Sequence, residues 1–352
     1  MQADAQRDSR FDVRSSVSGL PLLSIVCPVY REAETIERFH AVLTRALNPL
    51  RSRYRIEVLY VLDPSPDESE ARLSGIVASD PEVGLIVMSR RFGHQAALVA
   101  GIEHSEGDAV VMLDSDLQHP PELIPELVRR WEEGADIVQT LRQDDLSVSW
   151  FKRTTSRYFY RFLLKVGSID LPVGAADYRL VSSRIARTLS NELPERNPFL
   201  RGLFNWVGFN VCYVPFATVP RYGGRSKYNV ASLLGFALNG IFSFSKFPLR
   251  LCIGAGIVLA FLSVAFTAFQ VTMYLVGSDA VPGWASLFGA VGIIGGIQLL
   301  FLGMIGEYIS IIFDEVKQRP RYLISRHTGP ASREHRSQKT ANPRETSVDL
   351  HA

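Results

Sequence analysis

The chain has 352 residues, of which 47% are hydrophobic and 21% charged, and this length predicts two domains. A formal net charge of +2 does not favour a nucleic-acid-binding protein. The three cysteines lack the spacing of a metal site or a disulfide framework, which indicates a reducing compartment.

Short apolar runs alternate with amphipathic segments from Leu22 onward. The runs predict buried strands, and the amphipathic segments predict helices. Their repeated strand–helix order is typical of an α/β fold with a mostly parallel, doubly wound sheet. We predict strands at 22–28, 57–62, 84–89, 109–113 and 136–141, and helices at 34–47, 68–79, 95–104 and 122–133.

Polar side chains lie at the ends of the first two predicted strands. Tyr30 and Glu32 follow the first strand, which ends at Pro28, and Asp63 follows the second. Parallel strands bring their carboxyl ends to one sheet edge, where open α/β folds bind ligands. An aromatic ring can stack on a nucleotide base, and carboxylates can bind the polar edge of that base. Tyr30, Glu32 and Asp63 therefore predict nucleotide binding at this sheet edge. The structural alternatives are that Pro28 ends a strand and that Glu32 caps a helix. The sequence has no glycine-rich dinucleotide motif and no P-loop.

Two carboxylates, Asp114 and Asp116, follow the apolar run 109–113 and precede a helix start at Pro120-Pro121. Clustered anions repel each other unless a cation joins them. Carboxylate oxygens, together with the side-chain oxygen of Gln118, suit Mg²⁺ or Mn²⁺. This pattern predicts a divalent metal that carries a substrate diphosphate, although Asp-x-Asp alone also occurs in surface loops.

Two stretches without charged residues, 251–278 and 280–306, lie in the last third of the chain. Each is long enough to cross a bilayer, and we predict transmembrane helices at about 251–276 and 284–308. Lysines and arginines flank only the outer ends, so the positive-inside rule places both termini in the cytoplasm. The alternative is a buried helical hairpin in a soluble protein.

An amphipathic segment with few charges precedes the first stretch. We predict that it lies in the membrane interface; a helix in a soluble core is the alternative. The amino-terminal segment is polar and has no signal-peptide pattern. The predicted order is a disordered tail 1–20, an α/β domain 21–229, interfacial helices 230–248, two transmembrane helices within 249–313 and a basic cytoplasmic tail 314–352.

The motifs at the strand ends, taken together, resemble glycosyltransferase family two, whose catalytic domain has the Rossmann-like GT-A fold. They are Pro28-Val-Tyr30-x-Glu32, Asp63-x-Ser-x-Asp67, Arg90-x-Phe92-Gly93 and Asp114-x-Asp116-Leu-Gln118-His-Pro-Pro. Later segments resemble the polyprenyl-phosphate glycosyltransferases, a group with two carboxyl-terminal spans. These segments are Trp150-Phe-Lys152-Arg153, Asp177-Tyr-Arg179, Glu195-Arg-Asn197-x-Phe-Leu-Arg201 and Gly224-x-Ser226-Lys227-Tyr228.

The resemblance implies inverting transfer of one sugar from a nucleotide diphosphate sugar, with UDP favoured, to undecaprenyl phosphate. This reaction would take place at the cytoplasmic face of the inner membrane and would supply a cell-envelope glycan or lipid. Assembly through the spans is also implied, and glycines at 289, 292, 295, 296 and 303 would allow the close packing of a homotetramer. The sequence lacks the Gln-x-x-Arg-Trp motif of processive synthases, which favours a single transfer.

The resemblance also assigns roles to residues of this chain. The donor nucleotide would contact Pro28, Tyr30, Glu32, Asp63, Arg90 and Asp114, while Mg²⁺ or Mn²⁺ would use Asp114, Asp116 and Gln118. The acceptor phosphate would be held by Lys152, Arg153, Arg179, Arg201 and Lys227, although each alone could be a solvated surface charge. Asp116 and Asp177 would be the catalytic carboxylates. Asp177 would act as a base or orient the phosphate, and a salt bridge to Arg179 is its structural alternative.

Three positions depart from the family pattern. Leu62 stands where an aspartate is usual, Arg91 replaces an asparagine, and Gly174-Ala-Ala176 replaces Asp-Thr-Gly. These changes leave the donor sugar open. Two other functions also stay open: direct transfer to a lipid or glycan, and a non-catalytic membrane scaffold with a degenerate transferase domain.

Overall fold

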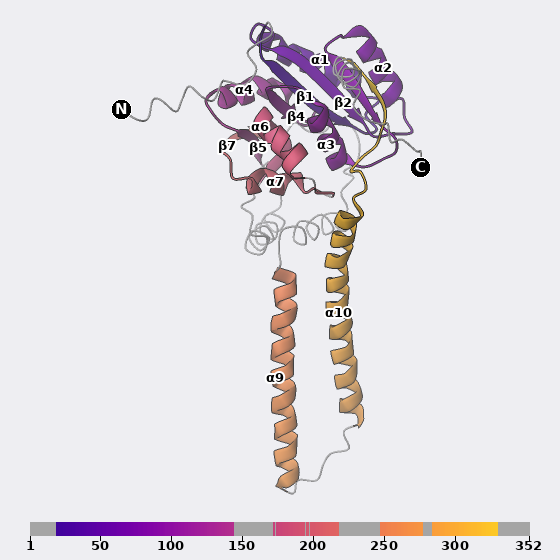
Figure 1. Ribbon diagram of the computed structural model, residues 1–352, viewed down its shortest axis with the longest axis vertical. Helices are drawn as coiled ribbons and strands as arrows, with labels where there is room; N and C mark the ends of the chain where they lie inside the picture. The colour runs from indigo at the N-terminus through magenta and orange to yellow at the C-terminus, as the bar shows by residue number, and fades with distance from the viewer. Residues whose placement is uncertain are drawn as a thin grey trace, which may run out of the picture.

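The computed structural model describes residues 19–143, 172, 174–193, 195–196, 198–217, 247–276 and 284–329. Within these ranges one eight-stranded sheet has the order β7-β5-β6-β4-β1-β2-β3-β8 (Figure 1). The strands are β1 Leu22–Val29, β2 Arg55–Leu62, β3 Val83–Met88, β4 Ala109–Met112, β5 Ile137–Gln143, β6 Ala175–Ser182, β7 Val211–Ala217 and β8 Ile324–Thr328. The predicted α/β fold is confirmed.

The centre of the sheet is parallel, as predicted. β1 pairs in parallel with β2 and β4, and β2 pairs in parallel with β3. The register places Val29 beside Leu62, so the ends of β1 and β2 lie at one edge. β6 is antiparallel to both β4 and β5, and β8 is antiparallel to β3. The sequence did not predict β6, β7 or β8.

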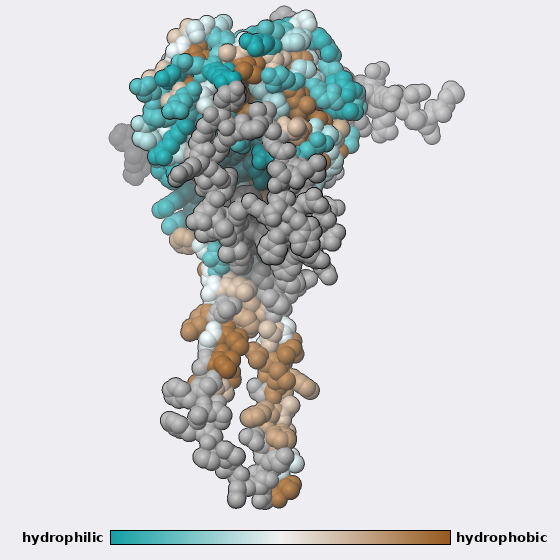
Figure 2. Space-filling view, turned by 180° about the vertical axis from the view of Figure 1, so that it is seen from behind, coloured by the Kyte–Doolittle hydropathy of each residue, from teal (hydrophilic) through white to brown (hydrophobic). Residues whose placement is uncertain are grey.

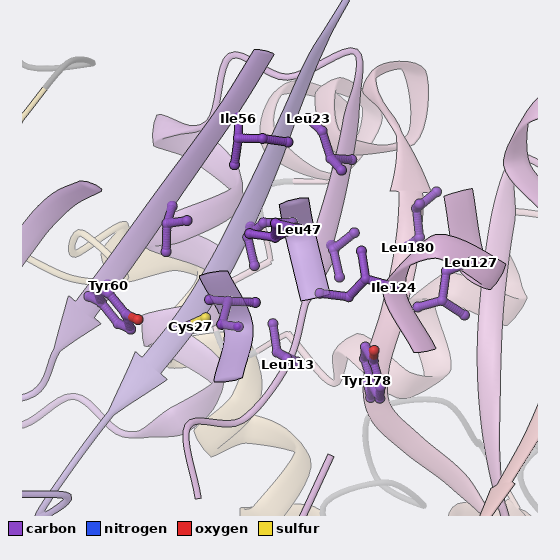
Figure 3. Packing of buried hydrophobic residues seen from close by; sticks show 14 of the residues in the cluster. Leu23, Cys27, Leu47, Ile56, Tyr60, Leu113, Ile124, Leu127, Tyr178 and Leu180 are labelled. Carbon is purple, nitrogen blue, oxygen red and sulfur yellow. The ribbon is translucent and has the colours of Figure 1, made fainter. Parts of the chain in front are cut away.

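Helices cover both faces of the sheet. They are α1 Ile36–Leu47, α2 Ser69–Ser79, α3 His94–His104, α4 Ile124–Glu132, α6 Ser183–Arg187 and α7 Leu200–Trp206, with short helical turns η2 Asn48–Leu50, η3 Pro121–Leu123 and η4 Thr188–Glu192. One buried cluster joins the sheet to α1, α2 and α4, and Figure 3 shows part of it. The other joins the sheet to α3, α6, η4 and α7. Neighbouring residues of β1 enter opposite clusters, Ile25 the first and Val26 the second, which explains why its sequence is apolar throughout.

Two long helices, α9 Phe247–Leu275 and α10 Trp284–Lys317, extend side by side from the α/β domain (Figure 1). They leave from the side that carries α3, α6 and α7. Apolar side chains are exposed on both helices, among them Phe261 at 74% and Leu299 at 70%, and Figure 2 shows this hydrophobic surface. Among the described residues, one segment, Ile293–Lys317, is long and apolar enough to cross a membrane.

The segment after α10 returns to the domain, where β8 pairs with the β3 edge. We expected a basic tail from 314 onward, but α10 continues to Lys317 and residues 324–328 complete the sheet. The polar sequence Ile-Ser-Arg-His-Thr gave no strand signal, because β8 lies at an edge and is partly exposed. Most of the predicted amino-terminal tail, residues 230–246 of the interfacial helices and the tail beyond 329 lie outside the described residues.

Candidate active site

Asp63, at the end of β2, holds the loop that leads into α3. Its carboxylate accepts hydrogen bonds from the backbone N–H groups of Phe92 at 3.0 Å and Gly93 at 2.8 Å. Asp63 is 3% exposed. Gly93 has a φ of 97°, in the left-handed region that glycine adopts without strain, and it immediately precedes α3. Asp63 therefore shapes the edge where a donor would bind.

We expect Asp63→Asn to destabilise this loop and to weaken nucleotide binding. An amide offers one acceptor oxygen, so one of the two N–H groups loses its partner at a cost of about 1–3 kcal/mol. Thermal unfolding and nucleotide titration would measure the two effects. Glu122→Gln, at an exposed carboxylate, is the control that should change neither. Unchanged stability of Asp63→Asn would show that these two bonds contribute nothing.

The other predicted donor residues lie around the same edge. The Arg91 guanidinium lies over the Tyr30 ring, 4.2 Å from its centroid, and that of Arg90 lies 4.0 Å from the centroid of Phe92. Glu32 accepts a hydrogen bond from the Thr35 hydroxyl at 2.7 Å, which is a contact between side chains and not a cap on the backbone N–H groups that begin α1. The structure thus brings Tyr30 together with Arg91, a position where the chain departs from the family pattern.

Pro28 and the Asp-x-Asp turn are joined by a buried contact. The carbonyl of Pro28 accepts a hydrogen bond from the Ser115 hydroxyl at 3.0 Å. Leu117 has a φ of 63°, which tightens the turn, and the backbone N–H of Gln118 donates to the Asp116 carboxylate at 3.1 Å. This turn holds Asp116 next to the end of β4, at the edge predicted from the sequence.

Two histidines that the sequence did not predict for the site contact Asp114. His94 Nε2 lies 2.7 Å from Oδ1 of Asp114, and His119 Nδ1 lies 3.5 Å from Oδ2. His119 Nδ1 also accepts the backbone N–H of Asp114 at 3.1 Å, so its ring is neutral. The position of His94 as the first residue of α3, at the same sheet edge as Asp114, was the signal available in the sequence.

Asp114 and His94 form an ion pair at neutral pH. Burial opposes the imidazolium, but the charge of Asp114 and its hydrogen bond raise the pKa of His94 to about 9. Burial likewise opposes the carboxylate, yet the charge of His94 and its hydrogen bond hold the pKa of Asp114 below its usual range. Burial lowers the pKa of His119, in agreement with its neutral ring. Asp114, just after the end of β4, is therefore a carboxylate that binds a positive charge, that of His94.

The residues of this turn fit a divalent metal that is shared with a substrate. Asp114 and Asp116 supply hard oxygen donors two residues apart. Within the described residues, no group of three or more His, Cys, Asp or Glu side chains could hold an ion alone. Mg²⁺ is commonly held by one or two carboxylates together with substrate phosphates, which is the donor set that this turn offers.

A second charged cluster lies on β6 and α7. Asp177 receives two hydrogen bonds from Arg201, at 2.8 and 2.7 Å, and one from Arg179 at 3.2 Å. Arg179 is 1% exposed, and its guanidinium lies 4.3 Å from the centroid of Phe204. Its Nη1 atom is buried without a hydrogen-bond partner. An unpaired buried donor of this kind suits an anionic ligand.

The two clusters are neighbours. β4 and β6 are antiparallel with Met112 beside Arg179, and continuing this register by two residues brings Asp114 opposite Asp177. Burial opposes the Asp177 carboxylate, but Arg201 and Arg179 hold its pKa well below the usual range. Burial lowers the pKa of Arg179 to about 10, so it stays charged at neutral pH. The salt bridge that we kept as the alternative for Asp177 is present.

The remaining predicted site residues, Lys152, Arg153 and Lys227, lie outside the described residues. Of the predicted acceptor cations, the structure therefore places Arg179 and Arg201, and it places them on the same carboxylate.

This chain is similar to one protein family, to two related proteins and to one solved structure that are named below. The family described as Glycosyl transferase family 2 matches residues 24–190. An uncharacterized glycosyltransferase of Synechocystis is 40% identical over 303 residues, covering 86% of this chain and 94% of that protein. A prophage-derived bactoprenol glucosyl transferase of Shigella flexneri is 37% identical over 308 residues, covering 87% of this chain and 99% of that protein. Glucosyl-3-phosphoglycerate synthase of Mycobacterium tuberculosis, solved with Mn²⁺, UDP and glucosyl-3-phosphoglycerate, matches with a TM-score of 0.41 and 20% identity over 63% of this chain and 78% of that one.

Proposed function

We propose a specific reaction for this chain, which belongs to glycosyl transferase family 2 and is a glycosyltransferase. It moves one sugar, with inversion, from a UDP-sugar to the phosphate of a polyprenyl phosphate such as undecaprenyl phosphate. The observation that carries this proposal is the Asp177–Arg179–Arg201 cluster beside Asp114, because it puts two cations, one of them buried, next to the predicted donor site. The named function of the Shigella flexneri relative supports the same acceptor class.

On the donor side, we propose that the nucleotide lies over the ends of β1 and β2. Tyr30 offers a ring for stacking, and Asp63 fixes the loop that carries Arg90 and Arg91. Asp114 and Asp116 would hold Mg²⁺ or Mn²⁺, with Gln118 as a further oxygen donor. When bound, this ion supplies positive charge to the diphosphate leaving group.

On the acceptor side, we propose that Arg179 and Arg201 hold the attacking phosphate. A phosphate is already anionic at neutral pH, so the reaction needs positioning and charge neutralisation more than proton removal. The low pKa of Asp177 makes it a weak base. Of its two predicted roles, orientation of the phosphate, through the two arginines, is therefore the one that we propose.

We propose that α9 and α10 anchor the enzyme by crossing the inner membrane twice, with the α/β domain in the cytoplasm. Their lengths of 29 and 34 residues exceed the roughly 20 that a bilayer requires. Their exposed apolar side chains and the 3.3 Å contact between Cys252 Sγ and Met304 Sδ support two adjacent spans. Apart from the carboxyl-terminal segment, whose strand β8 joins the sheet, the domain limits predicted from the sequence remain part of this proposal. Assembly as a homotetramer also remains part of it, and native mass measurement in detergent would test the assembly.

A donor panel tests the reaction. Purified protein, undecaprenyl phosphate and Mn²⁺ or Mg²⁺ would be incubated with individual UDP- and GDP-sugars, and lipid products would be identified by mass spectrometry. We expect a single productive donor and one sugar per lipid. Absence of product from every donor, with no nucleotide bound by the folded protein, would instead favour the scaffold function. Product only on a glycan or another lipid would favour direct transfer.

A further inference from the structure

The segment that follows α10 is bound to α3 through the Glu103 carboxylate and through His104, whose Nδ1 lies 3.3 Å from the Tyr322 hydroxyl. Glu103 Oε1 accepts a hydrogen bond from Arg321 Nη1 at 3.0 Å, and Glu103 Oε2 accepts one from the Tyr322 hydroxyl. The Arg321 side chain is 9% exposed and that of Glu103 25% exposed. We call Glu103, Arg321 and Tyr322 the α10 latch. Because breaking a largely buried ion pair leaves an uncompensated charge, this contact holds its two segments firmly.

Three further hydrogen bonds join the α10 end to the same side of the domain. Arg321 Nη2 donates to the Leu193 carbonyl at 2.7 Å, next to η4. The Glu315 carboxylate, in the last turn of α10, accepts the backbone N–H of Arg196 at 2.7 Å. The backbone N–H of Ser89 donates to the Leu323 carbonyl at 2.8 Å. The end of α10 is thus attached to several elements, not to a single loop.

The elements around the latch carry both charged clusters of the site. α3 has Glu103 near one end and His94, which pairs with Asp114, at the other. α7 carries Arg201, which pairs with Asp177. A narrow cavity between α3, η4 and α7 is walled by Glu103 and Arg321 together with the apolar side chains of Val99, Ile102, Leu189 and Leu203. The latch therefore lies between the end of α10 and the helices that carry the site.

We propose that Glu103 is a positioning residue that orients the active site toward an acceptor held in the bilayer. This inference rests on the proposed function, in which α10 crosses the membrane and the acceptor is a lipid phosphate. With the latch closed, the α/β domain has one height and tilt above the membrane, so that Arg179 and Arg201 meet the lipid phosphate. With the latch open, the domain loses one of its fixed contacts with the end of α10 and its tilt varies, so the effective concentration of the embedded phosphate at the site falls.

A comparison of two acceptors distinguishes positioning of the domain at the membrane from an effect on the transfer step itself. Full-length Glu103→Gln would be assayed with undecaprenyl phosphate in vesicles and with a short, water-soluble polyprenyl phosphate. We expect kcat/KM for the embedded acceptor to fall about tenfold or more, because misplacement of reacting groups by an ångström has costs of this order. The soluble acceptor diffuses to the site unaided, so its kcat/KM should stay within about twofold.

Glu70→Gln is the matched control. Glu70 accepts a hydrogen bond from Arg326, in the same returning segment, at 2.7 Å, but both side chains are about half exposed. We expect this variant to use both acceptors like the wild type, since exposed ion pairs contribute little. A double-mutant cycle with Arg321→Gln should show that the double variant is no worse than the worse single variant.

Equal loss with both acceptors, or no loss with either, would overturn the positioning role of Glu103. If Glu103→Gln lowers thermal stability too far for assay, Tyr322→Phe removes one latch bond and should give the same acceptor-selective loss in milder form; equal effects on both acceptors there would also overturn the role. A wild type that transfers sugar to neither acceptor would refute the proposed function and this inference with it.

Discussion

Removing the charge of Asp116 should abolish sugar transfer. We expect Asp116→Ala and Asp116→Asn each to lower kcat by about a thousandfold or more, because lost stabilisation of a developing charge has costs of this order. The asparagine variant keeps an oxygen that can accept the backbone N–H of Gln118, so the turn at Leu117 should persist. Product formation in the donor panel, with circular dichroism as the check on folding, measures the effect.

The exposed Glu122, six residues further along, provides the control for Asp116. Glu122→Gln removes one negative charge from the same segment and should leave transfer unchanged. Wild-type activity in Asp116→Asn would show that the enzyme does not need this carboxylate, and it would remove the principal metal ligand from the proposal.

The second large effect is expected at Asp177. In Asp177→Asn the buried Arg179 would lose its ionic partner, with a cost to stability of about 3–5 kcal/mol. Transfer should be lost as well, because the two arginines would no longer be held in place for the phosphate. Arg201→Gln should lose transfer with a smaller loss of stability, since Arg201 is 31% exposed and Arg179 keeps its carboxylate. Chemical denaturation and the transfer assay measure both variants.

The stability difference between wild type and Asp177→Asn should depend on pH in one direction. The pKa of Asp177 is depressed in the folded protein, so its stabilising effect is complete above the unfolded value of about 3.9. It is then lost as the pH falls toward the folded value. Unfolding measurements should give a constant difference between about pH 5 and 8 and a smaller one below about pH 4. A difference that changed between pH 6 and 8 would identify a different titrating group, with His94 the first candidate.

The central strands were predictable because each is buried on both faces. β1, β2 and β3 are apolar over nearly their whole length, and the structure places them within about two residues of the predicted limits. β6 was missed because Asp177 and Arg179 interrupt its apolar pattern. Arg201 of α7 pairs with Asp177 and so stabilises these charges inside the sheet. Because Arg201 lies 24 residues away in the sequence, the local pattern around Asp177 does not predict this pairing.

From the positions of the strand ends we could predict where a site would form. They did not show which side chains would contact each other there. Asp63 was expected to contact the donor nucleotide. The structure shows that its carboxylate accepts the backbone N–H groups of Phe92 and Gly93. His94 and Asp114 are 20 residues apart in sequence, and they meet because α3 begins at the edge where β4 ends. Such pairings follow from the sheet order and the helix start, which local sequence does not specify.

β8 has a consequence for the order of biosynthesis. The strand that covers the β3 edge is encoded after both long helices, so the ribosome completes α9 and α10 before the sheet can close. Until then β3 presents unpaired backbone groups, which is the condition under which nascent sheets pair with other chains. The final strand can be added only when α10 has brought the chain back to the domain. In the proposed topology, maturation of the catalytic sheet therefore waits for membrane insertion of α9 and α10, and an enzyme that failed to insert would keep an open edge for quality control to recognise.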